Sequence, residues 1–432
     1  MIITTSLYDQ LSALYAEKET AAAEPWFSRL RTAAFDSFRA NGFPTAKNEE
    51  WRFTNVSPFL KEAYQLQPAA DAPAEGGSRI DLSALDAYEV VLNNGVPREL
   101  PEIPGIRISA LRDAAGSSLL QQYLGRSIQL SQSSFAALNT ALFTDGLLIE
   151  VEKNATIGKP LLITHAYNAA WPFFAQPRLL VVAHRSSRIE LVERYVVEGQ
   201  EAVFANGVTE CFVAENARVD HYDIQVAPAN FHLVNFTQVS QQADSLYNNH
   251  TYTLPGASFV RNNLHLDLQA SNTESHLYGL YLAGGSQLVD NHTLVNHAKP
   301  HCFSNELYKG VLADTARAVF NGKIMVQLDA QKTNAFQQNN NMLLSDKAVV
   351  DSKPQLEIFA DDVKCSHGST LGSFDESSLF YLKARGIGEA SARNMLVKAF
   401  AFDVTQQIPI TAVRDCVEAL ITQKMESLYD RT

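Results

Sequence analysis

A cysteine and a histidine lie two residues apart near the end of the chain. Cys365 and His367 belong to the segment Asp-Asp-Val-Lys-Cys-Ser-His-Gly, residues 361–368. If this segment is extended, the two-residue period of a strand puts both side chains on one face. A thiolate beside an imidazole suits iron, zinc or copper, and it also suits acid–base chemistry. Gly368 leaves room for a ligand or another backbone. The alternative is a buried cysteine beside a structural histidine, because most residues of both types serve packing.

The other histidines are concentrated in the middle of the chain. Ten of the eleven fall between His165 and His301. This density would suit a metal site, but the spacing of a strand pattern spreads the side chains over several strands. Hydrogen bonding on a polar face of a β-structure is therefore the preferred interpretation.

Composition and charge exclude several classes of protein. The chain has 432 residues, of which 46% are hydrophobic and 19% charged, as in a globular protein with a large core. Its net charge of −12 argues against nucleic acid as the main partner. The first residues show no secretion signal, and no apolar run is long enough to cross a bilayer. The four cysteines form no C-x-x-C pair, which is typical of a reducing compartment. We therefore expect a cytoplasmic protein.

Motifs of common enzymes are absent. The chain contains no G-x-x-x-x-G-K-[ST], no G-x-S-x-G and no H-E-x-x-H. Gly386-Ile-Gly388 begins a near match to a dinucleotide-binding loop, but it follows a helical pattern, so a turn between helices is expected. The sequence thus predicts no nucleotide hydrolysis by this chain itself.

A degenerate repeat with a period of roughly 30 residues, which is within the range of solenoid repeats, marks the middle of the chain. Between residues 147 and 374, β-branched and aromatic residues alternate with polar ones, and turn residues recur. One gap between copies, from Val213 to Leu282, is about twice as long as the others and leaves room for another copy at 254–260. A period of this length without helices indicates stacked strand rungs, that is, a parallel β-helix. The copies lie at 151–157, 182–189, 213–219, 282–288, 312–319 and 344–350.

Helical patterns flank this middle part. Apolar residues at helical spacing predict helices over 5–40, 110–142, 375–383, 389–407 and from Thr411 onward, and residues 93–95 predict a hairpin turn. Residues 42–54 are interpreted as a surface loop that Trp51 holds in place. The expected regions are, in order, an N-terminal helical region (1–66), a flexible linker (67–79), a mixed α/β lead-in (80–146), the β-helix core (147–374) and a C-terminal helical domain (375–432).

Three separated segments resemble the SufB/SufD family of the SUF iron–sulfur cluster assembly machinery. They are residues 42–54, 354–370 and 381–387, and with the rung-like middle they cover nearly the whole chain in order. The first segment and the Cys-x-His-Gly motif resemble the SufD branch more than the SufB branch. Ser369 departs from the family, which commonly has alanine there.

The resemblance implies a mainly β fold, a right-handed parallel β-helix flanked by N-terminal and C-terminal α-helical regions. It implies a non-catalytic scaffold subunit that pairs with SufB and with the ATPase SufC, and that assembles nascent iron–sulfur clusters at the SufB–SufD interface. His367 matches the family histidine that faces a cysteine of SufB, and Cys365 matches its neighbour, whose role as ligand or packing residue stays open. One Cys-x-His pair cannot fill the coordination sphere of a cluster, so other ligands must come from a second chain.

The C-terminal helices are the expected SufC site. The segment 389–407 carries more apolar surface than one buried face needs, and docking of an amphipathic helix into a groove is a common mode of binding. The expected cofactor is a transient cluster on the complex, with none on the isolated chain. Binding of reduced flavin to the complex, and a homodimer of isolated chains, are left open. The candidate SufC-binding residues are Arg385, Gly386, Glu389, Leu396 and Phe400.

Two other functions compete with this interpretation. One is a β-helix polysaccharide lyase or hydrolase, against which the missing secretion signal and the missing carboxylate pairs argue. The other is a purely structural solenoid that forms homo-oligomers and binds no metal.

Overall fold

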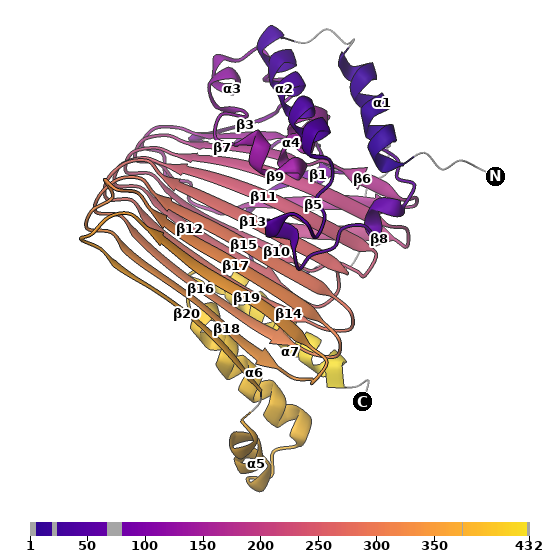
Figure 1. The fold of residues 1–432 in the computed structure, drawn as a ribbon, viewed down its shortest axis with the longest axis vertical. Coiled ribbons are helices and arrows are strands. Elements are labelled where there is room, and N and C mark those ends of the chain that lie inside the picture. Colours follow the sequence, from indigo (N-terminus) through magenta and orange to yellow (C-terminus); the bar gives the residue numbers. More distant parts are fainter. Residues whose placement is uncertain (1–5, 20–23, 67–79, 374, 430–432) are drawn as a thin grey trace, which may run out of the picture.

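The chain folds into a solenoid of two facing parallel sheets, and each turn contributes one strand to each sheet. This computed structural model describes residues 6–19, 24–66, 80–373 and 375–429. The predicted linker 67–79 lies outside the described residues. The mainly β class, the parallel β-helix and the helices at both ends are confirmed (Figure 1).

The two sheets are named here by their strands. Sheet A runs, in spatial order, β3 (Ile106–Ala110), β4 (Leu147–Val151), β7 (Arg178–Ala183), β9 (Val203–Val213), β11 (Phe231–Gln241), β13 (Phe259–Leu268), β15 (Leu288–His297), β17 (Arg317–Val326) and β19 (Val349–Ile358), and β6 (Phe173–Ala175) pairs with β9. Sheet B runs β2 (Val96–Pro97), β1 (Tyr88–Asn93), β5 (Leu161–Ala169), β8 (Arg188–Gly199), β10 (Arg218–Gln225), β12 (Leu246–Thr253), β14 (Glu274–Ala283), β16 (Phe303–Leu312), β18 (Asn334–Leu343) and β20 (Lys364–Ser373). The pairs β1–β2 and β3–β4 are antiparallel, and the former contains the predicted hairpin turn.

Residues with positive φ mark the corners of the solenoid. The corner from sheet A to sheet B recurs once in each turn, as the positions of its left-handed residues show. Asn and Asp adopt this conformation more readily than other non-glycine residues, which explains the polar punctuation of the repeat. The left-handed residues of this corner are Asn154, Ser186, Asn216, Asp244, Asn272, His301 and Lys332.

The predicted repeat mixes two different corners. Copies at 151–157, 182–189 and 213–219 lie between a strand of sheet A and a strand of sheet B, whereas those from 282 onward lie at the opposite corner. The extra copy proposed at 254–260 joins β12 to β13 and is the first of the second series. The long gap from Val213 to Leu282 therefore reflects a change of corner, because both corners repeat with the same period.

Each outer face of the solenoid is covered by one end of the chain. The helices α1 (Leu7–Glu19), α2 (Pro25–Asn41) and α4 (Ser134–Leu142) pack over sheet A, where Phe38 and Phe135 join Phe204 and Phe259 in one apolar core. The helices α6 (Glu389–Thr405) and α7 (Thr411–Tyr429) pack over sheet B, where Val397 and Val417 join Tyr252 and Leu282. Figure 1 shows the two helical groups at opposite ends of the solenoid, with α5 (Glu376–Ala384) projecting furthest.

One predicted helix is divided into shorter elements in the structure. Residues 110–142 form α3 (Ser118–Tyr123), the 3-10 turn η3 (Leu130–Gln132) and α4, because Gly125 takes φ +71° between α3 and η3. Asp375 caps the start of α5, since its side chain accepts a hydrogen bond from the Ser377 amide. Two further 3-10 turns, η1 (Glu49–Trp51) and η2 (Phe59–Lys61), interrupt the segment after α2. No helix in the described part of the chain is both long and apolar enough to cross a membrane.

Candidate functional site

The solenoid ends in an open rung. β19 and β20 are the last strands of sheets A and B, and no described strand pairs with their outer edges. The inner parallel strands have a neighbouring strand on both sides, and many of their residues are buried. In β19 and β20, by contrast, the residues are exposed or half-buried. The end of the β-helix that lies away from the N-terminal helices is therefore not capped by any further strand among the described residues (Figure 1).

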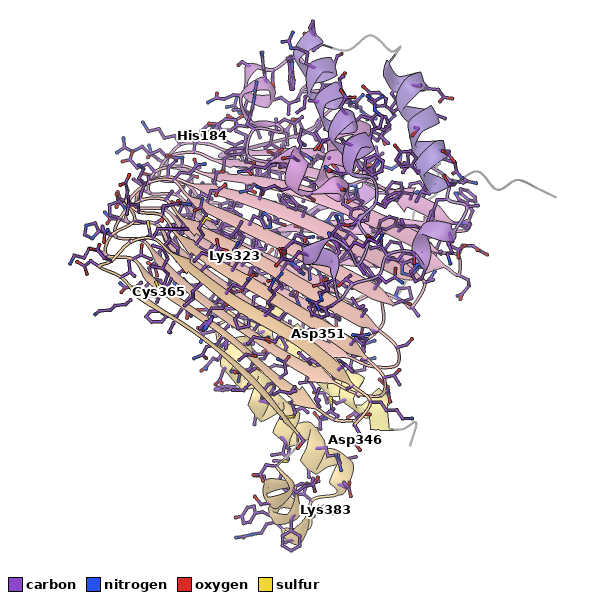
Figure 2. All side chains as sticks on the ribbon, in the orientation of Figure 1. His184, Lys323, Asp346, Asp351, Cys365 and Lys383 are labelled. Carbon is purple, nitrogen blue, oxygen red and sulfur yellow. The ribbon has the colours of Figure 1, made fainter. Side chains whose placement is uncertain are left out.

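Cys365 and His367 face the mouth of this open end. Along β20 they pair in register with Ala335 and Gln337 of β18, which are buried and point into the solenoid. Paired residues on neighbouring parallel strands point to the same face of the sheet. Cys365 therefore lies above Ala335, and His367 lies above Gln337, on the inward face of sheet B. The predicted shared face is confirmed, and Figure 2 shows Cys365 on the last rung.

The two side chains differ in environment. Cys365 is half-buried and packs against a small apolar cluster that contains Ala335 and Ile324. Burial raises the pKa of its thiol, and a hydrogen bond with the backbone of Ala335 partly offsets this rise. The thiol is therefore protonated at neutral pH until a metal or base takes the proton. His367 is exposed, and a side-chain atom added to Gly368 would meet nothing within 4 Å. The described residues contain no group of three or more potential metal ligands, so this rung offers a pair and not a complete site.

A buried carboxyl lies one rung below Gln337. Gln337 Nε2 donates a hydrogen bond of 2.7 Å to Oε2 of Glu306, which pairs with it in register on β16. Burial raises the pKa of Glu306 from 4.5 to about 7, although the hydroxyl of Thr293 and the amide of Gln337 lower it. The part of the interior beneath His367 is thus polar and contains an acid that resists ionisation.

Replacing Glu306 with glutamine should change the pH dependence of stability. The folded-state pKa lies above the unfolded one, so the folded chain binds more protons and wild-type stability falls as pH rises from about 4.5 to 7. Glutamine does not ionise. Between pH 5 and pH 8 the variant should therefore gain on the order of 2 to 3 kcal/mol over wild type. Urea unfolding at pH 5 and pH 8 measures the free energy of unfolding of both proteins. Glu102→Gln, a change at an exposed glutamate, is the control. If Glu306→Gln differs from wild type by the same free energy at both pH values, the prediction is wrong.

The segment after α2 crosses the outer face of sheet A as a strap, defined here as residues 42–66. The indole of Trp51 lies against the guanidinium of Arg261, 3.7 Å from the ring centroid. Arg261 donates to Asp290 at 2.5 Å and to the Glu50 carbonyl at 2.8 Å, and Thr54 donates to the same carboxylate. The predicted loop held by Trp51 is confirmed, and Arg261 is the partner that sequence reasoning missed.

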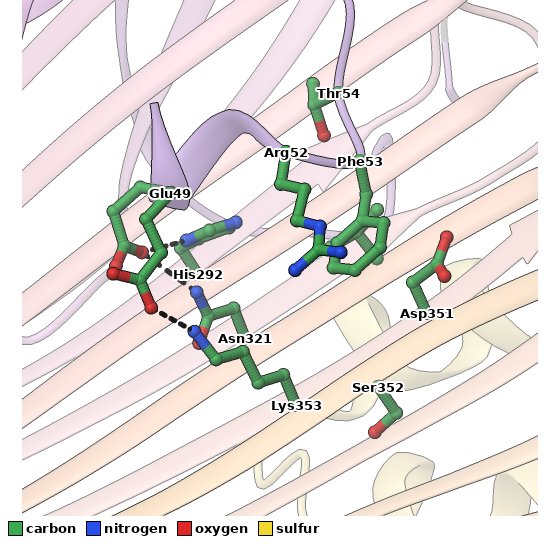
Figure 3. Close-up of a pocket in the computed structure, with 11 residues that line it drawn as sticks. Glu49, Arg52, Phe53, Thr54, His292, Asn321, Asp351, Ser352 and Lys353 are labelled. Carbon is green, nitrogen blue, oxygen red and sulfur yellow. Dashed lines mark hydrogen bonds and ion pairs between the residues drawn. The ribbon is translucent and has the colours of Figure 1, made fainter. Parts of the chain in front are cut away.

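The strap and the last strands of sheet A enclose a cavity of about 330 Å³ (Figure 3). Glu49 pairs with Lys353 of β19 at 2.8 Å, and Glu50 pairs with His292 at 3.2 Å. The hydrogen bond from His292 holds the pKa of Glu50 below its ordinary value. The strap thus reaches the terminal strand of sheet A and connects the N-terminal helices to the open rung.

Several of the middle histidines lie buried in the solenoid and form hydrogen bonds, in line with the preferred interpretation. Glu193 lies between His165 and His221, with 2.5 Å to each ring, and all three side chains are buried. His297 contacts the Ser304 hydroxyl at 2.9 Å, and burial lowers its pKa to about 3. These rings are spread along the solenoid and are used in separate hydrogen bonds.

Comparison with known proteins agrees with this architecture. The family described as "SUF system FeS cluster assembly, SufBD core domain" matches residues 165–400, and "SufBD protein N-terminal region" matches residues 5–163. The chain belongs to the SufBD family. It is 31% identical to an iron–sulfur cluster assembly SufBD family protein of Synechocystis sp. over 415 residues, 90% of this chain and 89% of that protein. SufD of Escherichia coli is 28% identical over 397 residues, 89% and 90% of the two chains, and SufD of Bacillus subtilis is 25% identical over 430 residues, 95% and 96%.

In this SufBD-family chain the C-terminal candidate residues separate into two groups. Arg385, Gly386 and Glu389 are exposed at the α5–α6 turn, where Glu389 pairs with Lys383 and Arg393. Leu396 and Phe400 are half-buried, because α6 packs them toward sheet B. The large exposed apolar side chains of α5 and α6 are instead Phe380, Tyr381, Met395 and Phe402.

A shallow cavity lies between α5 and α6. Its volume is about 340 Å³. Leu396 reaches this cavity, so one of the two half-buried candidates remains accessible from outside. The sequence indicated the excess of apolar residues on α6, but α5 carries the two most exposed ones. The lining residues are Ser377, Ser378, Tyr381, Leu382 and Leu396.

Proposed function

We propose that this chain is the SufD-type scaffold subunit of the SUF machinery, which pairs with SufB and the ATPase SufC and assembles nascent iron–sulfur clusters at the interface with SufB. The observation that carries the proposal is the open rung, because it presents Cys365 and His367 at an edge that nothing in the described chain covers. Relatives named SufD match nearly the full length of the chain and support the same role.

The open rung has the chemistry of a strand-pairing surface. The outer edges of β19 and β20 present unpaired backbone N–H and C=O groups, which are a template for another strand. Val349, Ile358 and Leu371 are large apolar side chains exposed on these strands. A rung of SufB added here would satisfy the backbone groups and bury the apolar ones, which is binding by strand addition.

The cluster would take ligands from both subunits. His367 and Cys365 supply an imidazole and a thiol, and SufB supplies the rest, because an iron–sulfur cluster needs more ligands than this pair. Since the Cys365 thiol holds its proton in the isolated chain, cluster binding must displace that proton. The cluster is transient and belongs to the complex, not to the isolated chain. Any reduced flavin would likewise bind the complex.

Co-expression with SufB and SufC tests the proposal. Untagged chain should co-purify with tagged SufB as a complex that also retains SufC and that accumulates iron and sulfide. Failure to bind SufB, or cleavage of polyuronides by the purified chain, would contradict the scaffold role. The isolated chain should form a homodimer through the same rung at high concentration, and SufB should displace it.

SufC binding should depend on the exposed apolar side chains of α5. Phe380→Asp and Tyr381→Asp place a charge where an apolar contact is expected, so each should reduce SufC binding about tenfold or more, as loss of an interface anchor does. Deleting residues 375–432 would be a poorer test, because α6 and α7 cover the apolar face of sheet B. Both variants should stay folded, since these side chains are exposed.

Binding of SufC to the immobilised chain measures this effect. Leu328→Asp is the matched control, because Leu328 is equally exposed but lies at a corner of the solenoid. If both α5 variants bind SufC as wild type does, the site lies elsewhere.

A further inference from the structure

Gln337 lies directly beneath His367 and has one satisfied and one unsatisfied polar atom. The two residues are register partners on β18 and β20. Gln337 Nε2 donates to Glu306, but the amide oxygen Oε1 is buried and has no hydrogen-bond partner. A buried carbonyl oxygen without a partner costs free energy, so a donor at this atom would stabilise the rung.

His367 is the histidine that the register places directly beside Gln337. Its ring makes no hydrogen bond to Oε1 in this structure, so the contact requires a rotation of the imidazole. Directly paired residues on adjacent strands lie within contact of each other's side chains. At this end of the solenoid only β20 lies outside β18, so the side chains of β20 separate Gln337 from solvent. A neutral imidazole carries one N–H and one free nitrogen, and the partner of the N–H decides which nitrogen stays free.

One hydrogen bond orients the Gln337 amide, and the absence of a side chain at Gly322 makes room for it. Oε2 of Glu306 accepts its hydrogen bond from the NH₂ group of the amide, which turns the amide oxygen away from the carboxyl. Across the interior, Gly322 of sheet A leaves space for this amide, because a side-chain atom there would lie 2.4 Å from Gln337 Nε2. The amide is thus oriented by Glu306 and lies close to the backbone of Gly322.

We propose that Gln337, oriented by Glu306, accepts a hydrogen bond from one ring nitrogen of His367 and so leaves the other ring nitrogen free, directed out of the mouth to bind iron. Metal-binding histidines commonly donate their second N–H to a carbonyl or carboxylate, which fixes the tautomer and the ring orientation. Gln337 and Glu306 are then positioning residues that do not touch the cluster. The iron-binding part rests on the proposed function, whereas the tautomer does not.

The tautomer of His367 provides the first test, on the isolated full chain. Nitrogen-15 NMR of labelled histidine should show one dominant neutral tautomer for the His367 signal, which is assigned by its absence in His367→Ala. Gln337→Met keeps the volume and removes the amide, so the His367 tautomers should move toward the mixture of a free imidazole. Gln338→Met, a change at the exposed neighbour in β18, should leave them unchanged. An identical tautomer ratio in wild type and Gln337→Met overturns the proposal.

The second test measures iron binding by the complex with SufB and SufC. Gln337→Met should lower the affinity for Fe²⁺ about 10-fold or more, as loss of an outer-shell partner does. Glu306→Gln preserves the volume but lets the Gln337 amide turn, so it should weaken both the tautomer preference and the affinity to a smaller degree. Altered tautomers with unchanged iron affinity would overturn the positioning role. Normal iron binding by His367→Ala would instead refute the proposed ligand and leave the tautomer result standing.

Discussion

Replacing His367 with alanine should abolish cluster accumulation on the complex with SufB and SufC while leaving the complex assembled. His367 is exposed on the open rung, so its removal creates no cavity and should not affect folding. Strand pairing along β19 and β20 involves many backbone groups, and one truncation seldom dissolves such an interface. We expect at least about a tenfold loss of bound iron and sulfide, because one cluster ligand is missing. Visible absorption and metal analysis of the purified complex measure it.

Two further variants show whether the loss of clusters is specific to His367. Ser366→Ala changes the residue between Cys365 and His367, on the opposite face of β20, and should leave cluster yield unchanged. Cys365→Ala should match His367→Ala if the thiol is a ligand, and should be milder if the thiol only packs against the apolar cluster around Ala335. Normal cluster yield from His367→Ala would make this histidine structural and would remove the main support for the proposed site.

Replacing Arg261 with methionine should cost stability more than any surface change. The guanidinium is buried between Trp51 and Asp290. Burial alone would raise the pKa of Asp290, but Arg261 and His292 together lower it to about 2. Without Arg261, the buried carboxylate of Asp290 keeps only His292 as a nearby positive partner. The strap also loses the contact between Trp51 and Arg261, which is its main anchor. Breaking a buried ion pair on one side costs about 3–5 kcal/mol, which urea unfolding would detect.

Controls separate the buried charge from general disruption. Arg317→Met removes an arginine whose partner Asp351 lies 3.2 Å away at the surface, and it should cost no more than about 1 kcal/mol. The double variant Arg261→Met, Asp290→Asn removes both charges and should be less destabilised than Arg261→Met alone. Equal losses for the two arginine variants would show that burial of this pair contributes nothing.

The period of the repeat could be predicted from the sequence, but the corner of the solenoid at which each copy lies could not. Corners repeat because each turn needs a residue that tolerates positive φ, and Asn, Asp and Gly record this need in the sequence. Both corners repeat with the same period and both contain residues with positive φ, so a degenerate pattern of apolar and turn residues does not tell one corner from the other. Only the strand order shows that copies before residue 220 and after residue 250 lie at opposite corners.

The shared face of Cys365 and His367 followed from strand alternation alone. Their position at an open mouth did not, because a terminal strand differs from a central one only in what lies beside it in space. Likewise, Trp51 was identifiable as an anchor, but its partner Arg261 lies on a distant strand of sheet A, and nothing in either local sequence connects them. Sequence patterns report periodicity and propensity, whereas these contacts depend on the complete set of rungs.

The strap has a consequence for the order of events during synthesis. Glu49 meets Lys353 across 304 positions of sequence, and Asn321 meets Glu50 across 271. At about 5–20 residues per second, the ribosome needs roughly 15–60 seconds between making the first and the last of these partners. The segment around Trp51 therefore emerges long before the surface that it covers exists, and its final contacts form only on a nearly finished chain. A polypeptide truncated before residue 353 would keep the contact between Trp51 and Arg261 but would lack the one between Glu49 and Lys353, so this last contact reports that translation has reached the terminal rung.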